Sequence, residues 1–263
     1  MDINTYQWIY NSVQKKEDII QVSKNASLPV GVVATILDQK VTTIVKKNYH
    51  KIKSKSEKHL LLWNSGLKII DIAKNNDIPS TLMASMILKE MGYPKQTIFK
   101  NMDAISDYRL KIELEEVIKS DIFYSPLAQK MKYEKGFLGE KLIQEWLLNQ
   151  NISFFTESDL RSSMAKKTPD FLLKESIKID STKVEWIESK AMFGCDSTHK
   201  YYLKKQLKEY EELYGVGMVV YWYGFIEHIT MNQNIIKDYN FFYNGDDDIN
   251  GAKKEIDSLL NWM

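Results

Sequence analysis

Cysteine is almost absent from this sequence, because Cys195 is the one thiol in 263 residues. A single thiol excludes an internal disulfide and the cysteine-cluster zinc sites. Long apolar runs are also missing: no stretch approaches the ~20 residues that a membrane-spanning helix needs. The first residues carry neither the cationic start nor the apolar block of a signal peptide. We therefore expect an intracellular protein, in the nucleus, the cytoplasm or both, that does not enter a membrane.

An excess of charge is lacking too, since 36 Lys and Arg residues oppose 35 Asp and Glu residues. The charges are unevenly distributed, however. Residues 1–135 hold 21 basic and 15 acidic side chains, and residues 136–263 hold 15 and 20. This asymmetry favours an N-terminal region that faces a polyanion and an acidic C-terminal region that can hold a cation.

The apolar spacing of the first part predicts two similar pairs of helices. In the first pair, about residues 17–41, apolar positions lie on both sides of a polar turn from Asn25 to Pro29. The second pair, about residues 66–91, repeats this plan around a turn from Asn75 to Pro79, with Ser80 as the expected N-cap. Such helix-turn-helix units can place their second helix in a DNA major groove. The alternative is a plain helical bundle.

A basic linker is expected between these two units, at residues 46–59 (KKNYHKIKSKSEKH). It contains six lysines and two histidines against one glutamate. Such a run can neutralise nucleic-acid phosphates and release counterions. The residues predicted to contact nucleic acid are Lys46, Lys47, Lys51, Lys53 and Lys55. The alternatives are a solvated connector and a weak nuclear-targeting signal.

The pattern changes near residue 131, and we expect a second domain from there to residue 263, after a helical region over residues 1–130. An amphipathic helix comes first, in EKGFLGEKLIQEWLLNQN. Short strands are then predicted in ISFFTES, DFLLK and VEWIESKAMF, followed by a long helix and the apolar strand of GMVVYWYGFIEHI. This order predicts an α/β domain in which helices flank a mixed sheet.

Two short motifs suggest a metal site in this second domain. Asp170 belongs to the only Pro-Asp pair, and Glu188 and Lys190 form the only Glu-x-Lys triplet. Because side chains alternate along a strand, Glu188 and Lys190 should point to one face and Ser189 to the other. If the strand after Asp170 pairs beside them, two carboxylates and an ammonium converge. Carboxylates suit Mg²⁺, and a lysine can handle a phosphate or its attacking water.

The alternative is structural: Asp170 would be a turn residue after Pro169, and Glu188 and Lys190 would form a polar stripe on a strand. Charged residues within the apolar stretch WIESKAMF nevertheless need a partner or a ligand. Glu140, on the helix before the strands, is a further candidate ligand, with an exposed helix glutamate as its alternative reading.

Three blocks of sequence, KTPDFLL, WIESKAMFG and VVYWYGFI, together resemble the TPD-motif proteins, the codanin-interacting nuclease family. The resemblance implies a PD-(D/E)xK nuclease domain with a restriction-endonuclease-like fold, preceded by helix-turn-helix units. One departure is that Cys195 follows Gly194, where the family tends to have an acidic residue. Asp196 comes one position later, which puts in doubt a role for that acid.

By position, the resemblance makes Asp170, Glu188 and Lys190 the catalytic triad, with Glu140 as an accessory metal ligand. It also matches Gln206 to a polar position that orients substrate or water, and His199 to a nearby histidine. The activity implied is hydrolysis of DNA phosphodiester bonds with Mg²⁺ or Mn²⁺. A codanin-like protein is the implied partner, and a homodimer is left open. The alternative function is a non-catalytic adaptor that uses an inactive nuclease fold as a docking surface.

Overall fold

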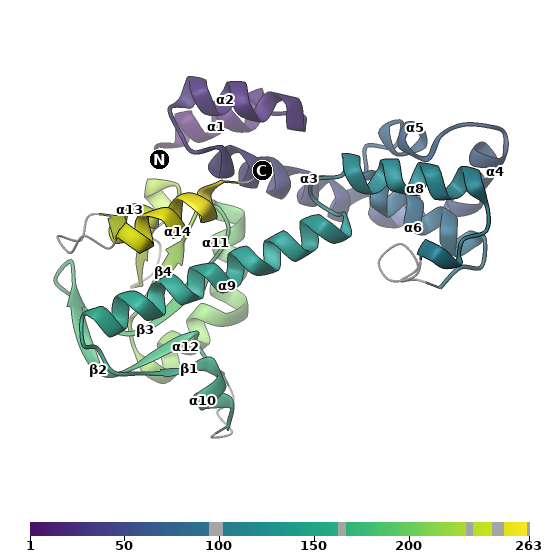
Figure 1. Ribbon diagram of the computed structural model, residues 1–263. Coiled ribbons are helices and arrows are strands. Elements are labelled where there is room, and N and C mark those ends of the chain that lie inside the picture. The colour runs from purple at the N-terminus through teal and green to yellow at the C-terminus, as the bar shows by residue number, and fades with distance from the viewer. Residues whose placement is uncertain (95–101, 163–166, 230–233, 244–249, 262–263) are drawn as a thin grey trace. The chain divides into compact units, whose positions relative to one another are not determined.

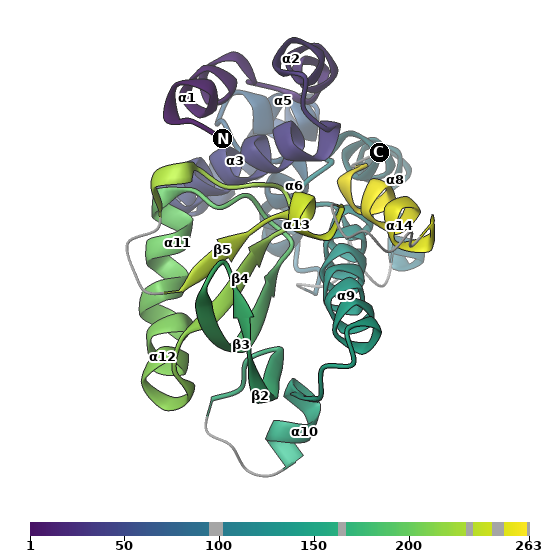
Figure 2. The ribbon, with the colours of Figure 1, turned by 90° about the vertical axis from the view of Figure 1, so that its left-hand side faces the viewer.

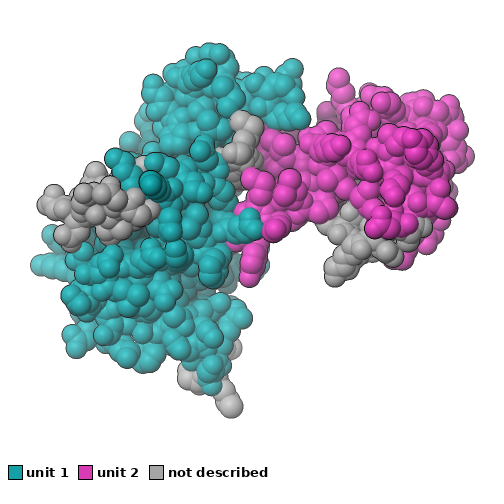
Figure 3. Space-filling view, viewed as in Figure 1, with its two compact units in different colours: residues 1–36, 134–263 teal, residues 37–133 magenta. Residues whose placement is uncertain are grey.

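The computed structural model describes residues 1–94, 102–162, 167–229, 234–243 and 250–261 (Figure 1). The protein forms two compact units: residues 1–36 with 134–263, and residues 37–133 (Figure 3). These boundaries differ from the division predicted between residues 130 and 131, because the first 36 residues pack with the sheet. We call the two parts the sheet unit and the helical unit.

The described residues of the sheet unit form a five-stranded mixed sheet; the sequence predicted a mixed sheet and four of these strands, but not the fifth. Its strands are β1 (Phe154–Thr156), β2 (Phe171–Ile179), β3 (Thr182–Lys190), β4 (Gly217–Tyr221) and β5 (Ile235–Lys237). They lie in the order β1-β2-β3-β4-β5. The pairs β1–β2 and β2–β3 are antiparallel, and the pairs β3–β4 and β4–β5 are parallel. Every residue of β4 is buried, which explains its continuous apolar sequence.

Helices cover both faces of this sheet (Figure 2). The parallel strands β3 and β4 are joined by a crossover, as parallel pairing requires. That crossover consists of α11 (Asp196–Tyr202), the π-helical turn η3 (Leu203–Leu207) and α12 (Lys208–Tyr214). On the other face lies α9 (Pro126–Asn149), whose residues from 134 onward belong to the sheet unit. The remaining described elements after β4 are η4 (Glu227–Ile229), α13 (Tyr239–Tyr243) and α14 (Asn250–Leu260).

The N-terminal helices are part of the sheet unit because they contact the segments that follow β3 and β4 and the end of α14. They are α1 (Ile3–Ser12), η1 (Lys16–Asp18), α2 (Ile19–Ala26) and the start of α3 (Val30–Lys53). The ring of Tyr6 in α1 stacks on Phe193, with centroids 5.4 Å apart. The terminal amino group of Met1 donates to the carbonyl of Phe225 at 3.0 Å. Gly31 lies so close to the carbonyl of Leu260 that a Cβ would be 2.2 Å from it.

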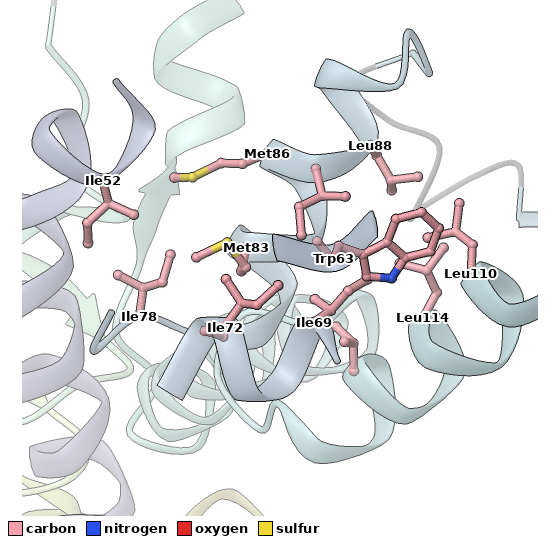
Figure 4. Close-up of a cluster of buried hydrophobic side chains, with 14 of the residues drawn as sticks. Ile52, Trp63, Ile69, Ile72, Ile78, Met83, Met86, Leu88, Leu110 and Leu114 are labelled. Atoms are coloured by element: carbon pink, nitrogen blue, oxygen red, sulfur yellow. The ribbon is translucent and has the colours of Figure 1, made fainter. Parts of the chain in front are cut away.

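The helical unit has its own apolar core (Figure 4). Its elements are the rest of α3, α4 (Ser56–Asn64), α5 (Ile69–Lys74), α6 (Ser80–Glu90), η2 (Met102–Ala104), α8 (Tyr108–Ser120) and the start of α9. A buried carboxylate, Glu113, ties three of its helices together. It accepts from the indole of Trp63 at 3.2 Å, the amide of Ile69 at 2.9 Å and the guanidinium of Arg109 at 2.8 Å. The charge of Glu113 is thus fully hydrogen-bonded inside the core.

Both predicted helix pairs are present as α2–α3 and α5–α6. Ser80, however, is the first residue of α6 and not its N-cap, which is Pro79. The helix start is instead capped from a distance, since the carboxylate of Asp121 accepts from the amide of Thr81 at 3.1 Å. Ser80 was predicted as the N-cap because its short hydroxyl side chain can accept from the first amides of a helix. Proline occupies the N-cap position and cannot do this, so a carboxylate from another segment accepts the hydrogen bond.

The expected basic linker at residues 46–59 is helical. Helix α3 continues to Lys53, and α4 begins at Ser56. The reason is burial: Ile52 is 7% exposed within the core, and the buried His59 lies 3.2 Å from the Ile52 carbonyl through its Nε2. The five predicted lysines, Lys46, Lys47, Lys51, Lys53 and Lys55, are all exposed. None of the helices in the described ranges is long and apolar enough to cross a membrane.

Candidate active site

The register of the sheet brings the two predicted carboxylates together. Phe171, the first residue of β2, pairs with Ile187 of the antiparallel strand β3. Asp170 therefore stands opposite Glu188, 18 positions later in the chain. Two hydrogen bonds hold this pair: the amide of Asp170 donates to Glu188 Oε2 at 3.2 Å, and the amide of Ser189 donates to Asp170 Oδ2 at 2.7 Å.

Lys190 lies on the same side of β3 as Glu188, as strand alternation requires. Its Nζ is 2.5 Å from Glu188 Oε1 and 3.2 Å from Gln206 Oε1. The ring of Tyr202 lies beneath the ammonium, with its centroid 4.6 Å from Nζ. Gln206 and Tyr202 come from the crossover helix, so that helix and β3 together hold the lysine.

Ser189 points to the opposite face of the sheet, towards α9. Its hydroxyl accepts from the indole of Trp222 at 2.9 Å. Gly139 of α9 is in close contact with both, because a Cβ there would lie 2.4 Å from the Trp222 nitrogen and 3.0 Å from the Ser189 hydroxyl. This contact fixes the depth at which α9 packs on β3 and β4.

The two carboxylates repel each other in a place that is poor in water. Burial raises the pKa of Asp170, and the negative charge of Glu188 raises it further, while the Ser189 amide and Lys190 act against the shift. Burial likewise raises the pKa of Glu188, and Lys190 opposes this. A second cation beside Lys190 would lower the free-energy cost of ionising both carboxyl groups.

Two further carboxylates interact with this site. Glu140 of α9 is exposed, and its pKa is raised by desolvation and by the charges of Asp170 and Glu157. Glu157 opens α10 (Glu157–Ser162), and its charge also raises the pKa of Asp170. Glu157 was not predicted from the sequence. It could have been found from its position directly after β1, because β1 pairs with β2. Its amide donates to the Asp170 carbonyl at 3.1 Å.

Two tyrosines of α12 hold the segment that leads into Asp170. The hydroxyl of Tyr210 donates to the carbonyl of Thr168 at 2.9 Å, and that of Tyr214 donates to the carbonyl of Lys167 at 2.7 Å. The ring of Tyr210 packs edge-on against Trp186, with centroids 5.3 Å apart. Hydroxyls one helical turn apart thus match two consecutive carbonyls, which positions Asp170 from its backbone side.

The donor set fits a hard divalent cation. Asp170 and Glu188 offer carboxylate oxygens, which Mg²⁺ and Mn²⁺ prefer, and a cation would offset the repulsion that raises both pKa values. Within the described ranges, no group of three or more His, Cys, Asp or Glu side chains is already arranged to hold a metal ion. Glu188 is instead paired with Lys190.

The other predicted site residues lie elsewhere. His199 is buried, with its Nδ1 3.0 Å from the hydroxyl of Tyr221 in β4. The predicted nucleic-acid-binding lysines, Lys46, Lys47, Lys51, Lys53 and Lys55, belong to the helical unit. The structure therefore brings together Asp170, Glu188, Lys190 and Gln206, and the charges of Asp170 and Lys190 act on the pKa of Glu140.

Comparison of the sequence with known proteins shows a family for this chain. A family model described as "Protein of unknown function TPD sequence-motif" matches residues 106–240, and Thr168, Pro169 and Asp170 form its motif. The chain belongs to the TPD family. Within the matched residues lie both carboxylates, Lys190 and the helix that holds it.

Proteins with similar sequences include some that are named as nucleases. "CDAN1-interacting nuclease 1" of Homo sapiens is 35% identical over 175 residues, which are 63% of this chain and 62% of that protein. The protein of the same name in Danio rerio is 33% identical over 183 residues, or 65% and 61% of the two chains. "Uncharacterized protein L539" of Acanthamoeba polyphaga mimivirus is 29% identical over 215 residues, or 76% and 71%.

The similarity to these relatives covers only part of their length. The chain spans 62% of the length of the human protein and 61% of the Danio rerio protein. No solved structure matches the chain.

Proposed function

We propose that this protein is a metal-dependent nuclease that hydrolyses phosphodiester bonds in DNA. The observation that supports this most is the convergence of Asp170, Glu188 and Lys190 at one place in the sheet, where Lys190 Nζ is 2.5 Å from Glu188 Oε1. Proteins with sequences similar to this chain are named as nucleases. A PD-(D/E)xK nuclease uses residues of these types for this chemistry.

Asp170 and Glu188 would hold Mg²⁺ or Mn²⁺, with Glu140 as an additional ligand. When bound, the ion would lower the pKa of a coordinated water and offset the charge that develops on the phosphoryl oxygens. The chain's own contribution is to keep both carboxylates in place, through the amides of Asp170 and Ser189, and to shield them from bulk water.

Lys190 is positioned to act on the phosphate or on the attacking water. An ammonium group has three N–H donors. Glu188 and Gln206 accept from two of them, which leaves the third for a phosphoryl oxygen or a water. Gln206 and the ring of Tyr202 limit the rotation of the side chain, so the lysine would pay little entropy to meet its substrate. We assign Gln206 to this orienting task.

DNA would also be held by the helix-turn-helix pairs α2–α3 and α5–α6 and by the exposed lysines of residues 46–55. Because Lys46, Lys47, Lys51 and Lys53 lie on helix α3 and Lys55 lies directly before α4, these lysines form part of a folded surface.

The second candidate function is that of an adaptor for a codanin-like protein in the nucleus or cytoplasm. The name of the human relative, which describes an interaction with CDAN1, favours it. In that case the fold of the sheet unit would serve docking, and the ion pair of Lys190 with Glu188 would be structural.

A cleavage assay separates the two functions. Purified protein is incubated with labelled single-stranded, duplex and branched DNA in Mg²⁺, in Mn²⁺ and in EDTA. We expect cleavage that requires metal and that falls at least ~100-fold in the Asp170→Ala and Glu188→Ala variants.

The matched control is Glu185→Gln, a carboxylate of the same strand on the opposite face, paired with Lys183 at 3.0 Å. It should cleave as the parent does. Failure of the parent to cleave any substrate would favour the adaptor, and undiminished cleavage by both alanine variants would show that the activity comes from elsewhere.

A further inference from the structure

An exposed aromatic ring stands next to the side chains that hold Lys190. Tyr201 is 49% exposed, although the adjacent residue, Tyr202, has its ring beneath the Lys190 ammonium. The two tyrosine rings contact each other edge-on, with centroids 5.1 Å apart. The candidate active site therefore continues through Tyr202 to a ring that faces water.

The ring of Tyr201 is held in place from the helix itself. Lys205 donates to the Tyr201 hydroxyl at 2.9 Å, and its ammonium lies 5.3 Å from the ring centroid. Together with the contact to Tyr202, these interactions restrain a side chain that has no place in the core. A restrained, exposed ring loses little conformational entropy when another flat group stacks on it.

The π-helical turn separates two sets of side chains in this region. Within η3, Gln206 faces Lys190, whereas Lys204 and Lys205 are exposed. Such π-turns occur frequently at functional sites, because the extra residue re-aims the neighbouring side chains. Here the turn places an orienting residue and two cations on the same short segment.

The helical segment that carries the exposed ring is rich in lysine. Lys200, Lys204, Lys205 and Lys208 are all exposed on α11, η3 and α12. The ion pairs found on α12 among the described residues join Lys208 to Glu212 and Glu209 to Lys167, and they include neither Lys200 nor Lys204. Lys208 is 3.9 Å from the exposed Glu212, a distance that contributes little to stability. Uncompensated lysines around an aromatic ring are the combination with which proteins bind single-stranded nucleic acid.

We propose that Tyr201, with Lys200, Lys204 and Lys205, binds an unpaired stretch of nucleic acid beside the reacting phosphate. One base would stack on the Tyr201 ring, and the lysines would contact the phosphates on either side. This inference rests on the proposed nuclease function and narrows its substrate to nucleic acid with unpaired nucleotides. A base in a continuous duplex is already stacked on both faces and offers no free face to the ring.

Binding is measured by fluorescence anisotropy with a labelled single-stranded oligonucleotide and with a duplex of the same length, in EDTA so that no strand is cut. We expect Tyr201→Ala to raise the Kd for the single strand about tenfold, which is the effect of losing one base–aromatic stack. The same variant should change duplex affinity less than twofold. Tyr201→Phe, which keeps the ring, should bind the single strand within about threefold of the parent.

A second variant tests the charges independently. Lys200→Gln with Lys204→Gln leaves the ring and its Lys205 contact intact. It should make the slope of log K against log salt shallower by about 1.4, because each phosphate contact on a single strand contributes about 0.7. Circular dichroism and the thermal transition of each variant should match those of the parent, since all three side chains are exposed.

The inference fails if Tyr201→Ala binds the single strand as the parent does, if it weakens single strand and duplex equally, or if the parent binds no single strand at all. These outcomes do not depend on cleavage. If the parent cleaves DNA only with metal but Tyr201→Ala binds the single strand as the parent does, this inference alone is contradicted. If the parent shows no metal-dependent cleavage, the proposed function is contradicted.

Discussion

Tyrosines on the crossover helix have separate tasks at the candidate site. Tyr202 packs beneath the Lys190 ammonium, whereas Tyr210 and Tyr214 hold the backbone before Asp170 through their hydroxyls. The first acts on a side chain and the others act on a loop. Removal of a hydroxyl should therefore loosen the loop and leave the sheet as it is.

This can be measured by amide hydrogen exchange. We expect Tyr210→Phe with Tyr214→Phe to speed exchange of the amides between residues 167 and 170, because two carbonyls lose their donors, at a cost of about 1 kcal/mol each. Exchange in β4, where every residue is buried, should not change. The prediction fails if exchange before Asp170 stays at the parent rate.

Tyr223→Phe is the control for that measurement. Its hydroxyl also donates to a carbonyl, that of Leu259, at 2.8 Å. The variant loses the same kind of bond at another place in the same unit, so its effect should be confined to α14. Equal effects of both changes before Asp170 would indicate general destabilisation in place of local release.

The sequence predicted that Glu188 and Lys190 share one face of a strand, and that Asp170 meets them if the strand that follows it pairs alongside. Side chains alternate along β3, so Glu188 and Lys190 lie on one face. The antiparallel pairing of β2 with β3 places Asp170 opposite Glu188. Glu157 and the tyrosines were not foreseen. Glu157 acts across a sheet edge whose pairing no local pattern specifies, and the faces of the crossover helix depend on a π-turn that breaks the 3.6-residue period.

Among the elements, α9 gives a direct test of how helix and sheet fit together. Gly139 faces the sheet, whereas a Cβ at Gly136 in the same helix would meet nothing within 4 Å. We expect Gly139→Ala to destabilise the protein by roughly 1–3 kcal/mol, because the methyl group would overlap the Trp222 indole. Gly136→Ala should stabilise it by about 0.4–1 kcal/mol through reduced freedom of the unfolded chain.

Urea unfolding followed by tryptophan fluorescence measures both changes. The two substitutions are chemically identical and lie three residues apart, so any difference between them reports the close approach at Gly139. Equal stabilisation by both would contradict the packing of α9 against Ser189 and Trp222.

The elements themselves followed the sequence closely in some places and not in others. The long apolar run of β4 and the short strands before it were predicted, and the mixed sheet is present. The stretch at residues 46–59 was taken for a linker because lysines dominate it. Its apolar positions are few but buried, and Ile52 in the core of the helical unit keeps the segment helical. The lysine-rich composition reflects the exposed side of this segment, whereas its buried side is apolar at Ile52.

The whole molecule shows why unit boundaries were harder to predict. The first 36 residues join the sheet unit through contacts with residues about 190 to 230 positions later, such as Tyr6 with Phe193 and Gly31 with Leu260. Helical periodicity identifies an apolar face, but it does not name the segment that will cover that face. A boundary placed at the change of sequence pattern therefore separated parts that fold together.

The claim on which the account depends is that Asp170 and Glu188 together hold a divalent cation in the folded protein. Calorimetric titration of the full chain with Mn²⁺, without nucleic acid, measures this most directly. We expect saturable binding by the parent, unchanged binding by Glu185→Gln, and at least a tenfold weaker Kd for Asp170→Asn, because one carboxylate ligand is lost. Equal Mn²⁺ affinity in the parent and in Asp170→Asn, or no binding by the parent, would contradict the account.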